Sequence, residues 1–364
     1  MESNMHIAYL ANFAPKKLGT GENRLMALAQ ESAKRKQRLT LFCYRPIHKD
    51  VEAVFREAGQ DIEDLSGLAA HPFRSILVLK RDFDAIVLNA IAPRSRLALL
   101  AYLAWPTRVY YVDHSSGPSV DIDYVGQPFW RRVLDRITFF RIYRAAGVSK
   151  YVRDRLRQRF QLPDDTVRAL YGGVDVERYR PSPEREESER IQIAVVAALI
   201  KEKGIDTLIR AVAAKRNPCW RLWIIGEGPD STRLRGLVEE HALNGVVEFL
   251  GLRDDVDVLL RKTDIFVHPA VWNEALGYTI LEGMASGCAV IASKTGAIPE
   301  LIDDGDNGFL VAPGSVDQIA DKLELLSEHR ELRKKLGSEA RRTVVDKFSL
   351  QRNVCETLDW LEKP

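Results

Sequence analysis

The chain has little cysteine and no long hydrophobic run. Its four cysteines, Cys43, Cys219, Cys288 and Cys355, are scattered among 364 residues without a CxxC pair or the spacing of a metal site. This pattern predicts free thiols in a reducing cytoplasm and argues against a disulfide framework. No apolar run reaches the roughly 18 residues expected of a membrane-spanning helix. A first strand predicted near Met5 leaves no room for a signal peptide, so we expect a cytoplasmic protein.

Length and charge indicate two domains of different electrostatic character. A chain of 364 residues exceeds one ordinary core, and its 46% hydrophobic and 29% charged residues are typical of a soluble globular protein. Residues 1–180 carry 29 Lys and Arg against 20 Asp and Glu, whereas the remainder carries 24 against 31. A basic half and an acidic half imply different partners.

The basic residues concentrate in segment 129–159, which contains ten Lys and Arg and only two acidic residues, Asp135 and Asp154. One interpretation is a solvated helix face. The other is a surface for a phosphate-bearing acceptor or for anionic lipid, which would place the protein peripherally at the inner face of the membrane. Nucleic acid is disfavoured, because no recognised binding motif is present and the second half is acidic.

Short apolar runs alternate with amphipathic stretches along the whole chain. Strands are predicted at 6–11, 38–44, 85–89 and 109–114, and again at 191–199, 221–226, 246–251, 265–270 and 288–293. This alternation predicts an α/β protein with doubly wound parallel sheets. The polar, proline-bearing stretch 181–190 separates an N-terminal domain, 1–180, from a C-terminal domain, 191–345. A final helix, 346–364, is expected to return to the N-terminal domain.

Four glycine-containing turns follow predicted strands, at 18–23, 201–206, 226–230 and 273–278. Glycine allows a close backbone approach to a ligand, and a helix start offers unpaired N–H groups and a partial positive charge. Such turns suit phosphate, although none matches a Walker loop and simple tight turns are the alternative. Together with Lys203, beside Gly204, they predict a diphosphate at the carboxyl ends of the strands.

The stretch "NEALGYTILEG" places Glu274 in a loop and Glu282 among apolar helical residues. A carboxylate one turn into the helix suits a ribose diol, and one in the preceding loop suits sugar hydroxyls. The alternative is that Glu282 lies on the solvated face of its helix.

These residues resemble those of glycosyltransferase family 4. The E-x7-E element runs from Glu274 to Glu282, and "KEKG", "DIFVHPA", "EGMASGCAVIAS", "GAIPELI" and "NGFLVAP" stand around it in family order. "YGGVDVERYRP" at 171–181 resembles the family's "NGVD…F.P" segment. The resemblance implies the GT-B fold, two Rossmann-like domains facing a central cleft, and a nucleotide diphosphate sugar as co-substrate.

The resemblance also implies roles for individual residues. Lys203, with Gly204, would contact the diphosphate, Glu282 the ribose, and Glu274 the sugar, helped by backbone N–H groups of Ala275, Leu276, Gly277 and Tyr278. Leu252 and Arg253 would lie near the base. The loop at Gly21 would approach the phosphates, and His114 would reach the transferred sugar unless it is a strand-end histidine bonded to backbone.

The chain departs from the family at Ala197 and Ala198, which replace a Gly-Arg pair whose arginine grips the diphosphate, and at Gly172, where asparagine is usual. A charge-assisted phosphate contact contributes roughly 1.5–3 kcal/mol, so Lys201 or Arg253 would have to substitute, or catalysis is weakened. The resemblance implies retention of configuration through same-face attack on an ion-pair-like transition state, with Lys203, Glu274 and His114 as catalytic groups. "DID" (121–123) and "DVD" (255–257) are short enough to arise by chance, so no metal is expected.

The predicted reaction moves a hexose to a saccharide or lipid-linked acceptor, in polysaccharide or lipopolysaccharide synthesis. A nucleotide-sugar-binding protein without turnover is the alternative that the missing arginine favours. A dehydrogenase is disfavoured, because a full GxGxxG with a downstream acid is absent.

Overall fold

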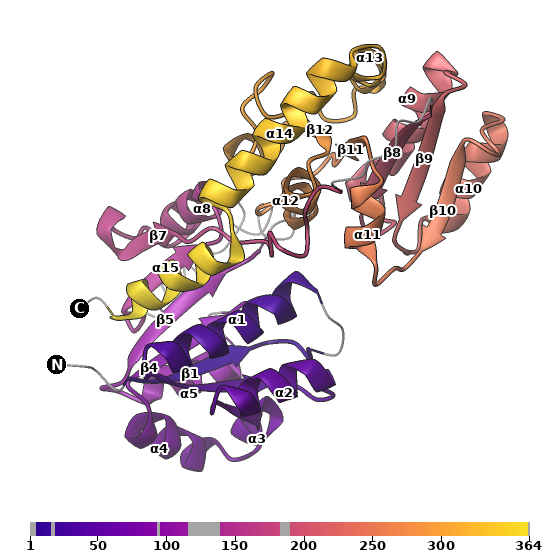
Figure 1. Ribbon diagram of the computed structural model, residues 1–364. Coiled ribbons are helices and arrows are strands. Elements are labelled where there is room, and N and C mark those ends of the chain that lie inside the picture. The colour runs from indigo at the N-terminus through magenta and orange to yellow at the C-terminus, as the bar shows by residue number, and fades with distance from the viewer. Residues whose placement is uncertain (1–4, 16–18, 93–94, 116–138, 183–189, 363–364) are drawn as a thin grey trace, which may run out of the picture. The chain divides into compact units, whose positions relative to one another are not determined.

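The computed structural model describes residues 5–15, 19–92, 95–115, 139–182 and 190–362. The chain divides into two compact units, an N-terminal unit of residues 1–173 and 350–364 and a C-terminal unit of residues 174–349. Each unit contains one parallel sheet with helices packed on it (Figure 1). The prediction of two Rossmann-like α/β domains is therefore confirmed. Residues 183–189 of the expected linker lie outside the described residues.

The N-terminal unit is built on a seven-stranded parallel sheet in the order β3-β2-β1-β4-β5-β6-β7. Its strands are β1 (His6–Ala11), β2 (Arg38–Cys43), β3 (Asp61–Asp64), β4 (Ala85–Asn89), β5 (Arg108–Asp113), β6 (Arg144–Gly147) and β7 (Val167–Ala169). Its helices are α1 (Thr20–Lys34), α2 (Lys49–Glu57), α3 (Leu65–Ala70), α4 (Pro72–Asp82), α5 (Arg96–Leu103), α8 (Lys150–Phe160), the short η1 (Asp164–Thr166) and α15 (Leu350–Glu362). The strand order reverses between β1 and β4, which is where open α/β sheets bind ligands.

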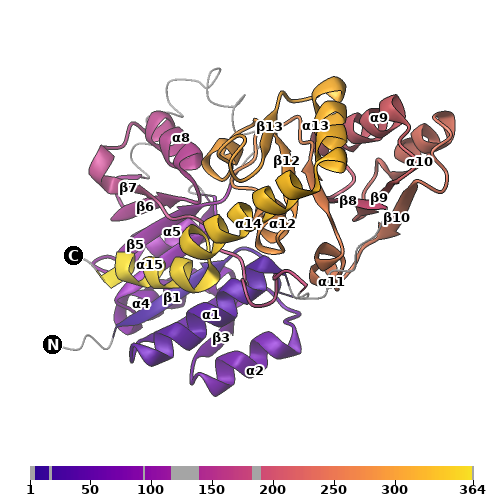
Figure 2. The same cartoon turned by 45° about the horizontal axis from the view of Figure 1, so that its top comes forward.

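The last helix, α15, packs against α1, and Figures 1 and 2 both draw the two helices side by side. The contact encloses Arg24, whose side chain is only 7% exposed. Its guanidinium donates to Asn353 Oδ1 at 2.9 Å and to the Tyr9 hydroxyl at 2.6 Å. A buried guanidinium is tolerated when such partners satisfy it, so these bonds fix the end of the chain to the N-terminal unit.

The C-terminal unit has a six-stranded parallel sheet in the order β10-β9-β8-β11-β12-β13. Its strands are β8 (Ile191–Val196), β9 (Trp220–Ile225), β10 (Val247–Gly251), β11 (Ile265–His268), β12 (Ala289–Ser293) and β13 (Phe309–Val311). Its helices are η2 (Lys201–Lys203), α9 (Ile205–Lys215), α10 (Ser231–Glu240), α11 (Val256–Arg261), α12 (Tyr278–Ala285), η3 (Ile298–Glu300), α13 (Val316–Glu328) and α14 (Arg330–Lys347). Here the order reverses between β8 and β11.

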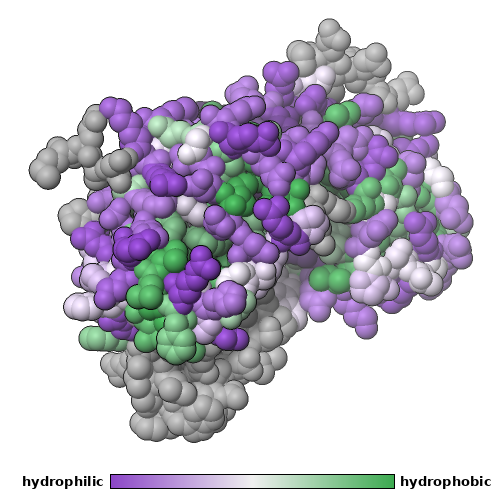
Figure 3. All heavy atoms as spheres, turned by 90° about the horizontal axis from the view of Figure 1, so that it is seen from below, coloured by the Kyte–Doolittle hydropathy of each residue, from purple (hydrophilic) through white to green (hydrophobic). Residues whose placement is uncertain are grey.

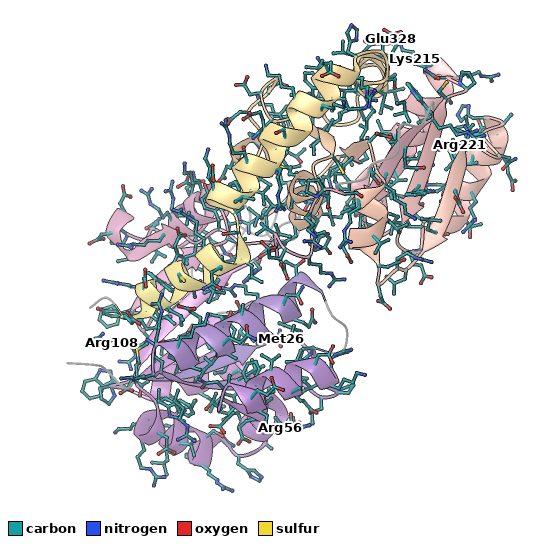
Figure 4. The ribbon with its side chains drawn as sticks, viewed as in Figure 1. Met26, Arg56, Arg108, Lys215, Arg221 and Glu328 are labelled. Atoms are coloured by element: carbon teal, nitrogen blue, oxygen red, sulfur yellow. The ribbon has the colours of Figure 1, made fainter. Side chains whose placement is uncertain are left out.

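Helix α9 shows how the amphipathic pattern produces the core of this unit. Ile205, Leu208, Ile209 and Val212 recur at the spacing of one helix face and are all buried against the sheet. At the end of α9, Lys215 pairs with Asp321 at 3.0 Å and Glu324 at 2.7 Å, and Figure 4 shows it lying against α13. The two helices thus cover the same face of the sheet.

Candidate active site

The loops that follow β8 and β11 meet at the reversal point of the C-terminal sheet. Lys203 ends η2 in the first loop, and Glu274 lies in the second. The Val271 N–H donates to the Glu202 carbonyl at 3.0 Å and joins the two loops. Lys203 Nζ donates to Glu274 Oε1 at 2.5 Å, and the side chains are 26% and 14% exposed. The structure therefore brings together the two residues expected at the diphosphate and the sugar.

A third side chain, His268, completes this cluster. It is the last residue of β11, is 3% exposed, and places Nε2 3.2 Å from the same Oε1 of Glu274. Burial alone would raise the pKa of Glu274, but His268 and Lys203 outweigh it and lower that pKa to about 2. Glu274 is therefore a carboxylate at neutral pH. We did not predict His268 as a site residue from the sequence, although a polar residue at the carboxyl end of a buried strand was a usable signal.

Two glycines allow the loops to approach each other. A Cβ on Gly204, which has φ +61°, would lie 2.1 Å from the Pro269 carbonyl oxygen. A Cβ on Gly296 would lie 2.3 Å from the Glu274 carbonyl oxygen, which accepts the Ala297 N–H at 2.9 Å. Larger residues would push these loops apart, so the glycines fix where the Lys203 and Glu274 side chains begin.

Helix α12 begins immediately beyond this cluster. Its N-cap is Gly277, at φ +96°, and Ala275 and Leu276 before it are buried. The first turn of a helix presents backbone N–H groups and a partial positive charge, and these suit an anion or sugar hydroxyls. The backbone of Ala275–Tyr278 thus lies between the two glutamates, as the family resemblance implied.

Glu282 lies inside α12 and is only 7% exposed, which excludes the solvated-face alternative. The Tyr179 hydroxyl hydrogen-bonds to its carboxylate. Burial and the charge of Glu282 both raise the pKa of Tyr179, which therefore stays a hydroxyl donor. Tyr179 was not predicted as a site residue, because tertiary contacts bring it to α12: Arg341 on α14 donates both to the Tyr179 carbonyl at 2.6 Å and to the Ala285 carbonyl, at the end of α12, at 2.9 Å.

The residues expected near the base are on the surface. Leu252 is 56% exposed, and Arg253 holds Asp255 through two hydrogen bonds of 2.8 and 2.6 Å. Asp257 accepts from Arg178 at 3.2 Å and from Arg261 at 2.8 Å. Arg253 would have to leave Asp255 to act as a replacement cation at Ala198, whereas Lys201 is exposed.

In the N-terminal unit, His114 directly follows β5 and Asn89 ends the neighbouring strand β4. His114 Nε2 lies 2.9 Å from Asn89 Oδ1, so the ring donates there and keeps Nδ1 as an acceptor. Its partner is a side chain, not the backbone of the alternative interpretation. Burial and the charge of Arg24 lower the pKa of His114 to about 3, so the ring is neutral at pH 7. Gly21 lies in the exposed first turn of α1, whose N-cap is Gly19.

Part of the predicted basic surface and one acidic motif fall on residues 116–138. Arg131, Arg132 and Arg136 and the "DID" triplet therefore lie outside the described residues. Within the described ranges, no helix is long and apolar enough to cross a bilayer, and no group of three His, Cys, Asp or Glu side chains is arranged to hold a metal.

Two family models match this chain and together cover residues 21–343. The model described as Glycosyltransferase Family 4 matches residues 21–178, and the model described as Glycosyl transferases group 1 matches residues 176–343. Their junction falls close to the boundary between the two units at residues 173 and 174.

Relatives and solved structures give the same assignment. The chain is 28% identical over 306 residues to the GDP-mannose-dependent alpha-(1-6)-phosphatidylinositol monomannoside mannosyltransferase of Mycobacterium tuberculosis, covering 78% of this chain and 77% of the relative. It is 33% identical over 150 residues, 41% of this chain and 43% of the relative, to the lipopolysaccharide core biosynthesis glycosyltransferase LpsE of Rhizobium meliloti. The crystal structure of Anabaena Alr3699/HepE in complex with UDP and glucose shares the fold, with a TM-score of 0.78 at 19% identity over 99% of this chain and all of that one. The chain belongs to glycosyltransferase family 4 and has the GT-B fold.

Proposed function

We propose that this glycosyltransferase moves a hexose from a nucleoside diphosphate sugar to a saccharide or lipid-linked acceptor, with retention of anomeric configuration. The observation that carries the proposal is the cluster of Lys203, Glu274 and His268 at the reversal point of the C-terminal sheet. A buried carboxylate held beside an ammonium and a helix start offers partners for both halves of such a donor.

The ion pair supports a specific order of events at the donor site. Without a donor, the Lys203 ammonium and the Glu274 carboxylate form an ion pair with each other. This pairing offsets the cost of removing two charges from water in the partly buried loops. A diphosphate carries more negative charge than one carboxylate and therefore binds the Lys203 ammonium more strongly. Lys203 therefore turns to the phosphates, Glu274 stays oriented by the contact of His268 with Oε1, and Oε2 of Glu274 accepts hydrogen bonds from the sugar hydroxyls.

The chemistry then depends on electrostatics and positioning. The C1–O bond to the diphosphate breaks, and the acceptor oxygen attacks the same face of the sugar while the departing phosphate oxygen takes its proton. Lys203 and the N–H groups at Gly277 and Tyr278 stabilise the charge that develops on the leaving group. Glu274 orients the sugar. No step requires a metal.

The acceptor class is proposed from the relatives. Their names include a phosphatidylinositol mannoside mannosyltransferase and a lipopolysaccharide core glycosyltransferase. One name contains a phosphatidylinositol monomannoside and the other contains lipopolysaccharide core biosynthesis, so we propose that this enzyme acts in polysaccharide or lipopolysaccharide synthesis at the inner face of a membrane.

A thermal-shift panel of UDP, GDP, ADP and their sugars tests the donor class. A ligand that binds the folded state raises the melting temperature by mass action, and about 2.7 kcal/mol of stabilisation is expected at a hundredfold excess over Kd. Release of nucleoside diphosphate with an acceptor mixture then tests turnover. A panel without any shift would overturn the proposal for the donor, and binding without turnover would favour the nucleotide-sugar-binding alternative.

A further inference from the structure

Residues 174–182 enter the C-terminal unit as a turn that belongs to no named helix or strand. The Tyr179 N–H donates to the Asp175 carbonyl at 2.9 Å and closes this turn. Carbonyls of such an irregular segment need hydrogen-bond partners from elsewhere when they are removed from water. Two of them accept from one side chain, because Arg341 Nη1 donates to the Val176 carbonyl at 2.8 Å and to the Tyr179 carbonyl at 2.6 Å.

The same nitrogen of Arg341 also reaches helix α12. Arg341 Nη1 donates to the carbonyl of Ala285, the last residue of α12, at 2.9 Å. The last carbonyls of a helix lack partners within it and carry a partial negative charge, so a guanidinium there stabilises the helix end. Helix α14, which carries Arg341, packs against α12. One guanidinium therefore fastens the turn at 174–182 to the end of α12.

The environment of Arg341 differs from that of a surface arginine. Hydrophilic side chains cover much of the face drawn in Figure 3, and the surface is the usual place of a guanidinium. Arg341 is half-buried, and this burial lowers its pKa below the usual value of arginine. The three carbonyl oxygens compensate for its lost hydration. The next residue, Arg342, is exposed and pairs with Glu339 on its own helix.

Tyr179 connects this junction to the donor site. Its side chain is 7% exposed, and its hydroxyl hydrogen-bonds to the carboxylate of Glu282, three residues before Ala285 in α12. Arg341 thus holds the backbone of Tyr179, while Glu282 accepts from its hydroxyl. The family segment that 171–181 resembles has phenylalanine at this position, so the hydroxyl departs from that pattern.

We propose that Arg341 is a positioning residue of the donor site: by fixing the Tyr179 backbone against the end of α12, it places the Tyr179 hydroxyl on the Glu282 carboxylate. The inference rests on the proposed function, with Glu282 binding the ribose of the donor. Hydrogen bonds weaken steeply with misalignment, so a displaced Glu282 carboxylate binds the ribose diol less tightly. The competing interpretation is that Arg341 only stabilises the fold.

A double-mutant cycle separates the two interpretations. Calorimetric titration with UDP, GDP and ADP measures the affinity of wild type, Arg341→Met, Tyr179→Phe and the double variant for each diphosphate that binds wild type. Arg341→Met should weaken binding about tenfold, as expected when one charge-assisted hydrogen bond to the ribose is misaligned. In the Tyr179→Phe background the same substitution should change the affinity less than about twofold, because the hydroxyl through which Arg341 acts is already absent.

Two further variants control for the loss of a guanidinium. Arg342→Met makes the same substitution at the next residue of α14 and should keep the wild-type affinity. Arg341→Lys keeps the charge but lacks the planar fork, so it should weaken binding only about threefold. Denaturant unfolding of every variant checks that it is folded during the titration. If Arg341→Met is unfolded, Arg341→Lys replaces it in the cycle, and its threefold loss should likewise vanish beside Tyr179→Phe.

The remaining outcomes decide against the proposal. Equal factors with and without the Tyr179 hydroxyl would show that Arg341 acts on the fold alone. Unchanged affinity in Arg341→Met, or an equal loss in Arg342→Met, would also overturn it. Failure of the proposed function is distinguishable, because wild type would then bind none of the three diphosphates, or Glu282→Ala would bind them as tightly as wild type. Binding by wild type together with an additive cycle removes only the role of Arg341.

Discussion

Lys203 Nζ lies 2.5 Å from Glu274 Oε1, and these two residues come from loops that follow different strands of the C-terminal sheet. The pair joins the residue expected at the diphosphate to the residue expected at the sugar. The two charges satisfy each other in this structure, so under the proposed function donor binding would exchange one ion pair for another.

This exchange predicts different effects for the two glutamates. Glu282→Ala should weaken nucleoside diphosphate binding about ten- to a hundredfold, because a hydrogen-bond acceptor for the ribose is lost. Glu274→Ala should leave that affinity nearly intact, since the diphosphate does not need Glu274 and Lys203 is released from its pair. Turnover should fall far more in Glu274→Ala, because the sugar is no longer aligned. Calorimetric titration and turnover of both variants make the comparison. Equal loss of diphosphate affinity would contradict the division of roles, and no loss of affinity or activity in either variant would refute the donor site.

The pKa of Glu274 predicts a pH-dependent contribution to stability. Because its pKa falls from 4.5 to about 2 on folding, the stabilisation is fully present above about pH 4.5 and is lost as pH falls towards 2. The contribution is on the order of 1–3 kcal/mol for this largely buried side chain. Denaturant unfolding of wild type and Glu274→Gln should therefore show a stability difference at pH 6 that narrows steadily below pH 4.5. A difference that is constant over this range would mean that His268 and Lys203 do not hold the carboxylate.

The strands that the sequence predicts well are those buried on both faces of the sheets. Apolar runs at 6–11, 85–89 and 265–270 correspond to β1, β4 and β11 within two residues at their ends. The strands without a prediction are short or polar. β3 is "DIED" at the edge of its sheet, and β7 is the three-residue "VRA" at the other edge. Edge strands bury little, so pairing with a neighbour defines them more than their own composition does.

The residues of the candidate site also differ in whether the sequence alone could predict them. Lys203 and Glu274 were predictable because glycine turns and a motif mark them, although 71 residues separate them. Tyr179 depends entirely on packing, because its partner Glu282 is 103 residues away and no local pattern connects them. Its role suggests a direct test: Tyr179→Phe removes only the hydroxyl that holds the Glu282 carboxylate.

The neutral state of His114 predicts a flat pH response. Because its pKa is lowered to about 3, His114 does not titrate between pH 5 and 8 and acts only as a hydrogen-bonding group. Between pH 5 and 8, the initial rates of wild type and His114→Gln should therefore depend on pH in the same way. The variant should be slower than wild type by a similar factor at each pH. An inflection near pH 6.5 that disappears in the variant would show that His114 works as an acid or base.

The acids of the "DVD" triplet lead to a prediction about metal ions. Asp255 is held by Arg253, and Asp257 by Arg178 and Arg261, so both carboxylates already have cationic partners within the described C-terminal unit. A divalent ion would have to displace those guanidinium groups, whereas Lys203 and the α12 helix start need no metal to stabilise a leaving diphosphate. We therefore expect nucleoside diphosphate release to proceed at an unchanged rate after dialysis against EDTA. Asp255→Asn/Asp257→Asn should not introduce a metal requirement, and addition of Mg²⁺ or Mn²⁺ should change the rate less than twofold. Restoration of lost activity by one of these ions would place a metal in the reaction and require a ligand set other than this triplet.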